Sequence, residues 1–183
     1  PRGSRRTPFR NARKVRLVVD ASVARAAGIP NTESGGGAAI SAFLIRLREA
    51  GMGIVFSRAL QAEWNTHQSR FSRTWRSSMV ARKRLHTSDL AEQIVLRQRI
   101  EALDNDRRCR NAMSKDAHLV ELALQEDERI VSLDEEARGC FSTLVPTHPP
   151  LGDVVWVNPT IPAHEAGDWL DKGAPKRPEL LLG

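Results

Sequence analysis

Four carboxylates in this sequence stand either just beyond an apolar, strand-like run or in the early turns of a helix that should follow. In an open α/β sheet, ligands bind outside the carboxyl ends of the strands, so side chains at these places can meet. Carboxylates that converge repel one another unless a cation lies among them, and hard divalent cations prefer oxygen ligands. The sequence therefore predicts a site for one or two Mg²⁺ or Mn²⁺ ions, built from Asp20, Glu63, Asp116 and Asp134.

The strands that should carry these acids are short apolar runs that contain β-branched residues. Residues 15–19 predict a first strand and residues 54–57 a second. A helix should begin near Arg58 and carry Glu63 in its second turn. The run 154–157 predicts the last strand, because it is apolar throughout and too short for a helix.

The stretch 114–134 combines two of the acids with the elements that should position them. Ser114 is a favourable N-cap, so Asp116 is expected in the first turn of a helix. Apolar residues then recur at helical spacing, which indicates a buried helical face. Residues 130–133 are too few for a helix and β-branched enough for a buried strand, and Asp134 is expected where this strand ends.

Four short motifs carry these acids, and together they resemble the motifs of the PIN-domain nucleases, a family that includes VapC-like toxins. The motifs are VVDASV (18–23), SRALQAEW (57–64), KDAHLVELAL (115–124) and IVSLDEEARGCF (130–141). They lie in the family's order between residue 15 and about residue 141, which is most of the chain.

The resemblance implies a three-layer α/β/α fold with a twisted, mostly parallel central sheet. It also implies a metal-dependent endoribonuclease whose catalytic, metal-binding acids are the four above, with the hydroxyls of Ser22 and Ser132 beside the metal. The family's precedent is RNA cleavage that leaves a 5′-phosphate, in the toxin of a toxin–antitoxin pair, with an antitoxin protein and a homodimer as possible partners. The residues themselves do not distinguish RNA from DNA.

The net charge of +6 matters for such an enzyme, because carboxylates repel a polyanion and basic residues must outweigh them. Residues 64–88 contain no acid, and we expect their basic side chains to bind a phosphate backbone. Phe71 and Trp75 either stack on bases or form a buried stripe, and their i, i+4 spacing favours the buried stripe. The cations predicted to contact nucleic acid are Arg70, Arg73, Arg76, Arg82, Lys83 and Arg84, joined by Arg107 and Arg108 from an expected charged loop at 104–111.

The chain divides into three parts by composition. Residues 1–14 are a basic arm whose first four residues look like the remnant of an expression tag. Residues 15–157 should form the PIN-like domain. Residues 158–183 are a Pro-rich extension that compact VapC-like toxins do not usually have, and it either packs on the domain or engages a partner.

Overall composition indicates a globular protein, with 40% hydrophobic and 27% charged residues. No apolar run approaches the ~20 residues of a membrane helix, so no membrane contact is expected. Cys109 and Cys140 show no disulfide framework and no metal-ligand spacing, which favours a reduced, cytoplasmic setting. The alternative from another functional class is a catalytically silent module on the same fold that binds nucleic acid or protein.

Overall fold

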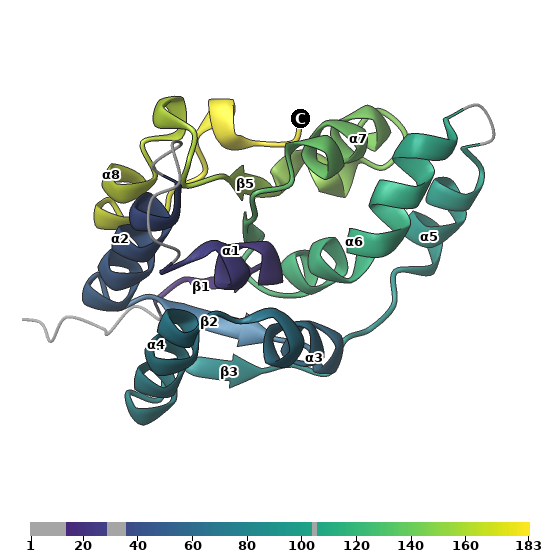
Figure 1. Cartoon of the computed structure of the whole chain (residues 1–183). Helices are drawn as coiled ribbons and strands as arrows, with labels where there is room; N and C mark the ends of the chain where they lie inside the picture. The colour runs from purple at the N-terminus through teal and green to yellow at the C-terminus, as the bar shows by residue number, and fades with distance from the viewer. Residues whose placement is uncertain (1–13, 29–35, 104–105) are drawn as a thin grey trace, which may run out of the picture.

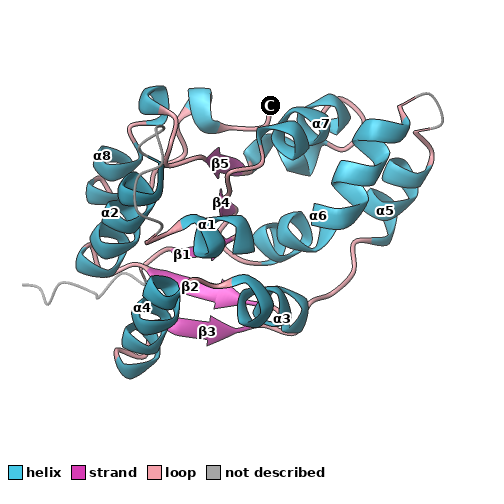
Figure 2. Cartoon of the chain, viewed as in Figure 1, coloured by secondary structure: helices cyan, strands magenta, loops and turns pink. Residues whose placement is uncertain are grey.

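The computed structural model describes residues 14–28, 36–103 and 106–183 of the chain. Within these residues one central sheet has the strand order β3-β2-β1-β4-β5, and every neighbouring pair is parallel. Helices surround this sheet (Figure 1, Figure 2). The strands are β1 (Arg16–Val19), β2 (Gly53–Phe56), β3 (Leu85–Thr87), β4 (Arg129–Val131) and β5 (Val155–Val157).

Crossovers between parallel strands are nearly always right-handed, so a reversal of direction in the strand order places the helices in two layers. The chain passes from β1 to β2 to β3 in one direction, and the helices of these connections pack on one another. They are α1 (Ala21–Ala26), α2 (Gly36–Glu49), α3 (Arg58–His67) and α4 (Arg70–Ala81). The chain then returns to β4 and β5 through a second layer, α5 (Ile94–Glu101), α6 (Arg107–Gln125) and α7 (Glu135–Leu144). The predicted three-layer α/β/α fold is confirmed.

The strand order creates a switch point between β1 and β4. These two strands are neighbours, but the connection after β1 leads to β2 on one side, whereas the connection after β4 leads to β5 on the other. A crevice forms outside the carboxyl ends of two strands whose connections diverge in this way. Asp20 directly follows β1, and its backbone N–H donates to the Val131 carbonyl of β4 (2.9 Å).

Four of the strands lie within one or two residues of the predicted runs, but β3 was not predicted. Leu85–Thr87 is a short edge strand that is only partly buried, so it lacks a continuous apolar run. By sequence alone, the apolar pair Leu144 and Val145 also predicts a minor strand, and this prediction is wrong. Leu144 is buried as the last residue of α7, and Val145 caps that helix.

The start of α6 also differs from the prediction. The helix begins at Arg107, and the Asp106 carboxylate caps it by accepting the backbone N–H of Cys109 (2.9 Å). Ser114 is therefore an internal residue and not the N-cap, and Asp116 lies in the middle of the helix. Of the charged loop predicted at 104–111, residues 107–111 are helical and 104–105 lie outside the described residues.

The apolar spacing of residues 89–103 predicts one helix with Leu90, Ile94, Ile100 and Leu103 inward, but α5 is shorter and has a different buried face. We expected Ile94 to point inward, but it is 66% exposed, whereas Leu96 and Ile100 are buried. The reason is the buried Glu121 carboxylate of α6, which accepts the Gln93 backbone N–H (2.9 Å) and the Arg97 guanidinium (2.7 Å). These contacts set both the first turn of α5 and the direction of its faces.

The C-terminal segment, residues 158–183, packs on the sheet domain. Trp169 is fully buried, and its helix α8 (Ala166–Asp171) packs against α2. Leu182 is also buried, and its backbone N–H donates to the Val154 carbonyl (3.0 Å) beside β5. Of the two alternatives for this segment, the structure shows packing on the domain.

The predicted basic arm at residues 1–14 lies outside the described residues except for Lys14. Among the described helices, none combines the length and the apolar character that crossing a membrane requires.

Candidate active site

A cleft of about 400 Å³ at the carboxyl edge of the sheet is lined by all four predicted acids. Asp20 reaches it from the end of β1, Glu63 from α3, Asp116 from α6 and Asp134 from the turn between β4 and α7. The cleft, which we call the carboxylate cleft, therefore lies at the switch point of the sheet. These acids are as many as 114 residues apart in the chain, and the topology brings them together.

Asp20 is the most firmly held of these acids. It is 8% exposed, and its Oδ2 accepts hydrogen bonds from the hydroxyls of Ser22 and Ser132, the latter at 2.8 Å. Ser22 also accepts the Leu133 backbone N–H (3.2 Å), so it ties α1 to the turn after β4. The two serines predicted beside the metal site thus orient one oxygen of Asp20 and leave Oδ1 for a ligand.

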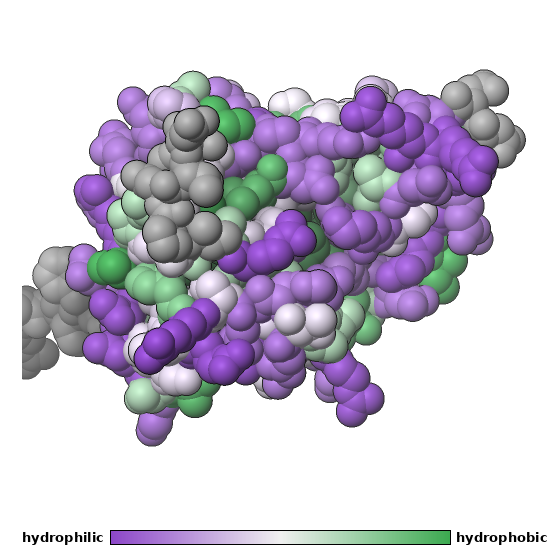
Figure 3. Space-filling model, viewed as in Figure 1, coloured by the Kyte–Doolittle hydropathy of each residue, from purple (hydrophilic) through white to green (hydrophobic). Residues whose placement is uncertain are grey.

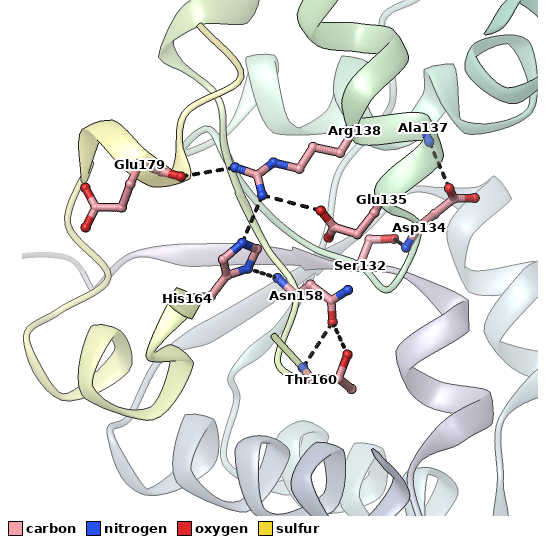
Figure 4. A network of polar contacts seen from close by, with 9 residues as sticks. All are labelled: Ser132, Asp134, Glu135, Ala137, Arg138, Asn158, Thr160, His164 and Glu179. Carbon is pink, nitrogen blue, oxygen red and sulfur yellow. Dashed lines mark hydrogen bonds and ion pairs between the residues drawn. The ribbon is translucent and has the colours of Figure 1, made fainter. Parts of the chain in front are cut away.

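Asp134 is both a cleft residue and a helix cap. Its Oδ1 accepts the Ala137 backbone N–H (2.8 Å) at the start of α7, and its own N–H donates to Ser132 Oγ (3.1 Å) (Figure 4). Because capping occupies Oδ1, Oδ2 is the oxygen that remains for a ligand. Ser132 is fully buried and contacts both Asp20 and Asp134, so it fixes the two acids relative to each other.

Among the cleft acids, Asp116 has the surroundings that least favour an ionised carboxylate. It is 5% exposed, and burial raises the pKa of its carboxyl to about 6. Lys115 opposes this shift, since its Nζ lies 3.6 Å from Asp116 Oδ1, while the charges of Asp20 and Asp134 add to it. A buried carboxylate next to two others is electrostatically suited to a bound cation.

Glu63 lies in the second turn of α3, as predicted, and faces His118 of α6. His118 Nε2 lies 3.3 Å from Glu63 Oε2, without the alignment of a hydrogen bond, and Nδ1 is 3.2 Å from the Lys115 carbonyl. The next residue, Trp64, is fully buried and donates its indole N–H to the Val19 carbonyl (2.8 Å). This bond fastens α3 to the end of β1, directly before Asp20.

The sequence reasoning missed four further residues that line the cleft: Arg25, His67, Lys115 and Glu135. Lys115 and Glu135 are the direct neighbours of predicted acids, so their positions next to Asp116 and Asp134 were the available signal. Arg25 is in the helix after Asp20, and its side chain reaches the same edge. On the face seen in Figure 3, hydrophilic side chains are interspersed with neutral and hydrophobic ones over the region where α1 and α3 lie.

The carboxylate cleft carries an excess of negative charge although the chain as a whole is basic. Its described lining holds five carboxylates and two permanent cations, Arg25 and Lys115. Among the described residues, no group of three or more His, Cys, Asp or Glu side chains is placed to hold a metal ion by itself. Mg²⁺ usually retains several waters and binds through one or two carboxylates, so this donor set suits a partly hydrated ion.

The six basic residues predicted from 64–88 do not lie at one place. Arg70 and Arg73 are exposed near the start of α4, where the Ser69 N–H donates to the Ala24 carbonyl of α1 (3.1 Å). Arg76 is half-buried and donates to Asn65 Oδ1 (2.9 Å). The start of α4 is therefore beside the helix that carries Arg25.

The other three basic residues lie at the amino edge of the sheet, where β3 begins. Arg82 caps the end of α4, and Lys83 (φ 54°) adopts the left-handed conformation of the turn that terminates it. Arg84 directly precedes β3, and its guanidinium donates to the Arg48 carbonyl (2.7 Å). The structure thus does not bring Arg82, Lys83 and Arg84 to the cleft.

The aromatic residues of α4 are part of the core. Trp75 is 2% exposed, stacks on Trp64 with ring centroids 6.1 Å apart, and donates to the Leu44 carbonyl (2.6 Å). Phe71 packs against the same cluster. The buried-stripe interpretation is confirmed for Trp75, whereas Phe71 is only partly buried.

The start of α6 is fastened to α7. Arg107 is exposed, whereas Arg108 forms an ion pair with Glu136 of α7. Cys109 and Cys140 form a disulfide between the same two helices. The expectation of unpaired cysteines is wrong, because two positions far apart in sequence face each other across the α6–α7 contact, and a reduced setting no longer follows from them.

Searches for this chain among protein-family models, curated proteins and solved structures gave no match.

Proposed function

We propose that this chain is a metal-dependent nuclease that hydrolyses phosphodiester bonds in RNA. The observation that carries the proposal is the carboxylate cleft, where Asp20, Glu63, Asp116 and Asp134 line one space at the switch point of the sheet. The choice of RNA rests on the resemblance of the four motifs to those of PIN-domain nucleases. DNA is the competing substrate in the test below.

Asp20, Asp116 and Asp134 are the residues that would hold Mg²⁺ or Mn²⁺, with Glu63 binding directly or through water. A divalent ion supplies an activated water and neutralises charge that develops on a phosphoryl oxygen. The chain's own part is to keep the acids ready for the ion. Ser22 and Ser132 orient Asp20, and the N-terminus of α7 orients Asp134.

The two permanent cations of the cleft contribute to substrate binding. Arg25 and Lys115 come from α1 and α6, so they approach the acids from different elements. A phosphodiester entering a cleft with five carboxylates is repelled unless positive charge faces it. We assign these two side chains to the phosphates next to the scissile bond.

The test is cleavage of a single-stranded RNA by the purified protein with Mn²⁺, with a DNA of the same sequence in parallel. Asp20→Asn and Asp116→Asn should each lower the rate at least about 100-fold, because each removes a charge at the site of chemistry. Glu49→Gln, an exposed acid on α2, is the matched control and should retain full activity. Cleavage that persists unchanged in both cleft variants would identify a contaminant and reject the proposal.

The absence of a preformed group of three metal ligands among the described residues favours one second candidate, a catalytically silent nucleic-acid or protein-binding module. Such a module would bind RNA with an affinity that falls as salt rises and would show no turnover with Mn²⁺ or Mg²⁺. Binding without cleavage at every metal concentration would therefore decide in its favour.

The cellular role that we propose is that of a cytoplasmic toxin, with an antitoxin protein as partner and a homodimer as the assembled form. This part rests on the family resemblance. If it is correct, induced synthesis of the chain should arrest growth, Asp20→Asn should abolish the arrest, and co-production of a small protein encoded next to it should relieve it.

A further inference from the structure

The C-terminal segment and helix α7 meet at one side chain, Arg138. Its guanidinium lies 2.9 Å from His164 Nε2, donates to the Glu179 carbonyl (3.1 Å), and lies 3.4 Å from Glu135 Oε2 (Figure 4). The Arg138 side chain is only 18% exposed. Arg138 thus connects two turns of the C-terminal segment with a carboxylate that lines the cleft.

The partners of Arg138 in the C-terminal segment are themselves held in place. His164 is 6% exposed, and its Nδ1 accepts the Asn158 backbone N–H (2.9 Å) directly after β5. Burial, followed by the charge of Arg138, lowers the pKa of His164. Because Nδ1 accepts the Asn158 N–H, a neutral ring carries its proton on Nε2, so the guanidinium contacts that nitrogen without donating to it. The Glu179 carbonyl, which accepts from Arg138, belongs to a short 3-10 turn, Pro178–Leu180. This carbonyl is therefore the hydrogen-bonded anchor of Arg138 in the C-terminal segment.

Glu135 is left with one unsatisfied oxygen. The Glu135 side chain is half-buried, with 38% of it exposed, and its Oε2 faces Arg138, whereas the Oε1 atom is itself buried and has no hydrogen-bond partner within the described part of the chain. A buried acceptor without a partner is unfavourable, and more so when it is charged. Glu135 lines the carboxylate cleft directly after Asp134, so a cation or a water bound to it would satisfy that oxygen.

We propose that Glu135 is a fifth carboxylate of the cation site and that Arg138, anchored by the C-terminal segment, is the residue that positions it. This inference rests on the proposed function, because it assumes that the cleft binds a divalent cation. It makes residues 158–183 a working part of the site: they hold the guanidinium that holds one oxygen of Glu135, and the other oxygen is left to the ion or to its water shell.

The test is Mn²⁺ binding to the full-length chain, measured from the electron paramagnetic resonance signal of free Mn²⁺. Glu135→Gln and Arg138→Ala should each weaken Mn²⁺ affinity about tenfold, the effect expected when a group that orients or completes a metal site is removed. If Arg138 acts through Glu135, the double variant should bind no more weakly than Glu135→Gln alone. A purely structural role for Arg138 would instead make the two losses add.

Two controls separate the possible failures. Lys172→Ala removes an exposed pair with Asp168 in the same segment without touching Arg138, its partners or Glu135, and it should bind Mn²⁺ like the wild type. Arg138→Lys keeps the charge and serves if Arg138→Ala does not fold. Its affinity should lie between those of the wild type and Glu135→Gln.

The outcomes are distinct. If the wild type binds no Mn²⁺, or if Asp20→Asn binds it equally well, the proposed function fails together with this inference. If Asp20→Asn weakens binding and Glu135→Gln does not, only the assignment of Glu135 is overturned. Additive losses in the Glu135→Gln, Arg138→Ala double variant would reject Arg138 as the positioning residue.

Discussion

Asp116 shows how a single side chain can be unfavourable for the fold and useful for a ligand. Its carboxylate is buried and has two acids as neighbours, and its charge is favoured by a lysine whose own side chain is 73% exposed and, less strongly, by His118. The folded chain without a cation therefore carries an electrostatic cost when Asp116 is ionised. A cation that enters the cleft removes this cost, so binding of the ion and stability of the fold are coupled.

This coupling gives a pH dependence with a definite sign. The folded-state pKa of Asp116, about 6, lies above its ordinary value of 3.8, so the folded chain holds this proton more tightly than the unfolded chain. Asp116 therefore lowers stability progressively as pH rises from about 4 to about 6, and the full cost, at most about 3 kcal/mol, is present at neutral pH.

Asp116→Asn should accordingly make the metal-free protein more stable at neutral pH and leave its stability little changed near pH 4. Urea unfolding at both pH values measures the difference, and Glu101→Gln, an exposed acid at the end of α5, is the control. A variant that is no more stable than the wild type at neutral pH would show that Asp116 is not strained by its charge.

At the scale of elements, α6 and α7 form one unit that holds two of the acids. Asp116 is in the middle of α6, and Asp134 caps the start of α7. The Cys109–Cys140 disulfide and the Arg108–Glu136 ion pair both cross this contact. The covalent link therefore limits how far the two helices, and the acids they carry, can separate.

Removal of this link should reduce stability by roughly 2–4 kcal/mol, the range typical for a native disulfide. The Cys109→Ser, Cys140→Ser double variant in urea unfolding is the measurement. Wild-type protein treated with a thiol reductant should reproduce its midpoint, and the double variant should not respond to the reductant. Equal midpoints for oxidised and reduced wild type would mean that the bond contributes nothing to the fold.

The elements that sequence reasoning found and those it missed differ in what determines them. The runs at β1, β2, β4 and β5 are buried strands, and continuous apolar residues mark them in any context. The helix α6 starts where Asp106 caps it. By residue type alone, Asp106 and Ser114 are both favourable N-caps, so the sequence does not show which of them is used. The partly buried strand β3 depends on its pairing with the edge of β2. Which face of α5 is buried depends on its contacts with the carboxylate of Glu121. Both are tertiary contacts.

The same difference between local sequence patterns and tertiary contacts separates the site residues that were predicted from those that were missed. The positions of Asp20 and Asp134 after apolar runs made their meeting at one sheet edge predictable from topology. Glu135, Arg25 and Lys115 were missed because their role depends on which way a side chain points, and neighbouring residues on a helix point in different directions. Arg138 and His164 meet only because the C-terminal segment folds back, and no local pattern encodes this.

At the scale of the whole molecule, the positive charge of α4 and of the turn after it is distributed between the two ends of that helix. Arg70 and Arg73 are near the start of α4, where Ser69 contacts Ala24 of α1, whereas Arg82 and Lys83 are at its far end. The helix that we expected to act as one basic surface thus carries cations at both of its ends, and its start contacts the helix that carries Arg25. We expect a polynucleotide whose scissile phosphate is in the cleft to contact the cations beside α1 and not those that directly precede β3.

RNA binding should therefore distinguish the two ends of α4. Arg70→Ala with Arg73→Ala should weaken binding of a labelled single-stranded RNA and reduce the slope of log affinity against log salt by about 0.7 for each phosphate that the variant no longer neutralises. Arg82→Ala with Lys83→Ala removes the same number of charges from the amino edge, so it is the matched control and should leave that slope unchanged. Fluorescence anisotropy over a series of KCl concentrations, without divalent metal so that no cleavage occurs, gives both values. Equal slopes for the two double variants would show that RNA binding follows the net charge of the chain and not the end of α4 at which the charge lies.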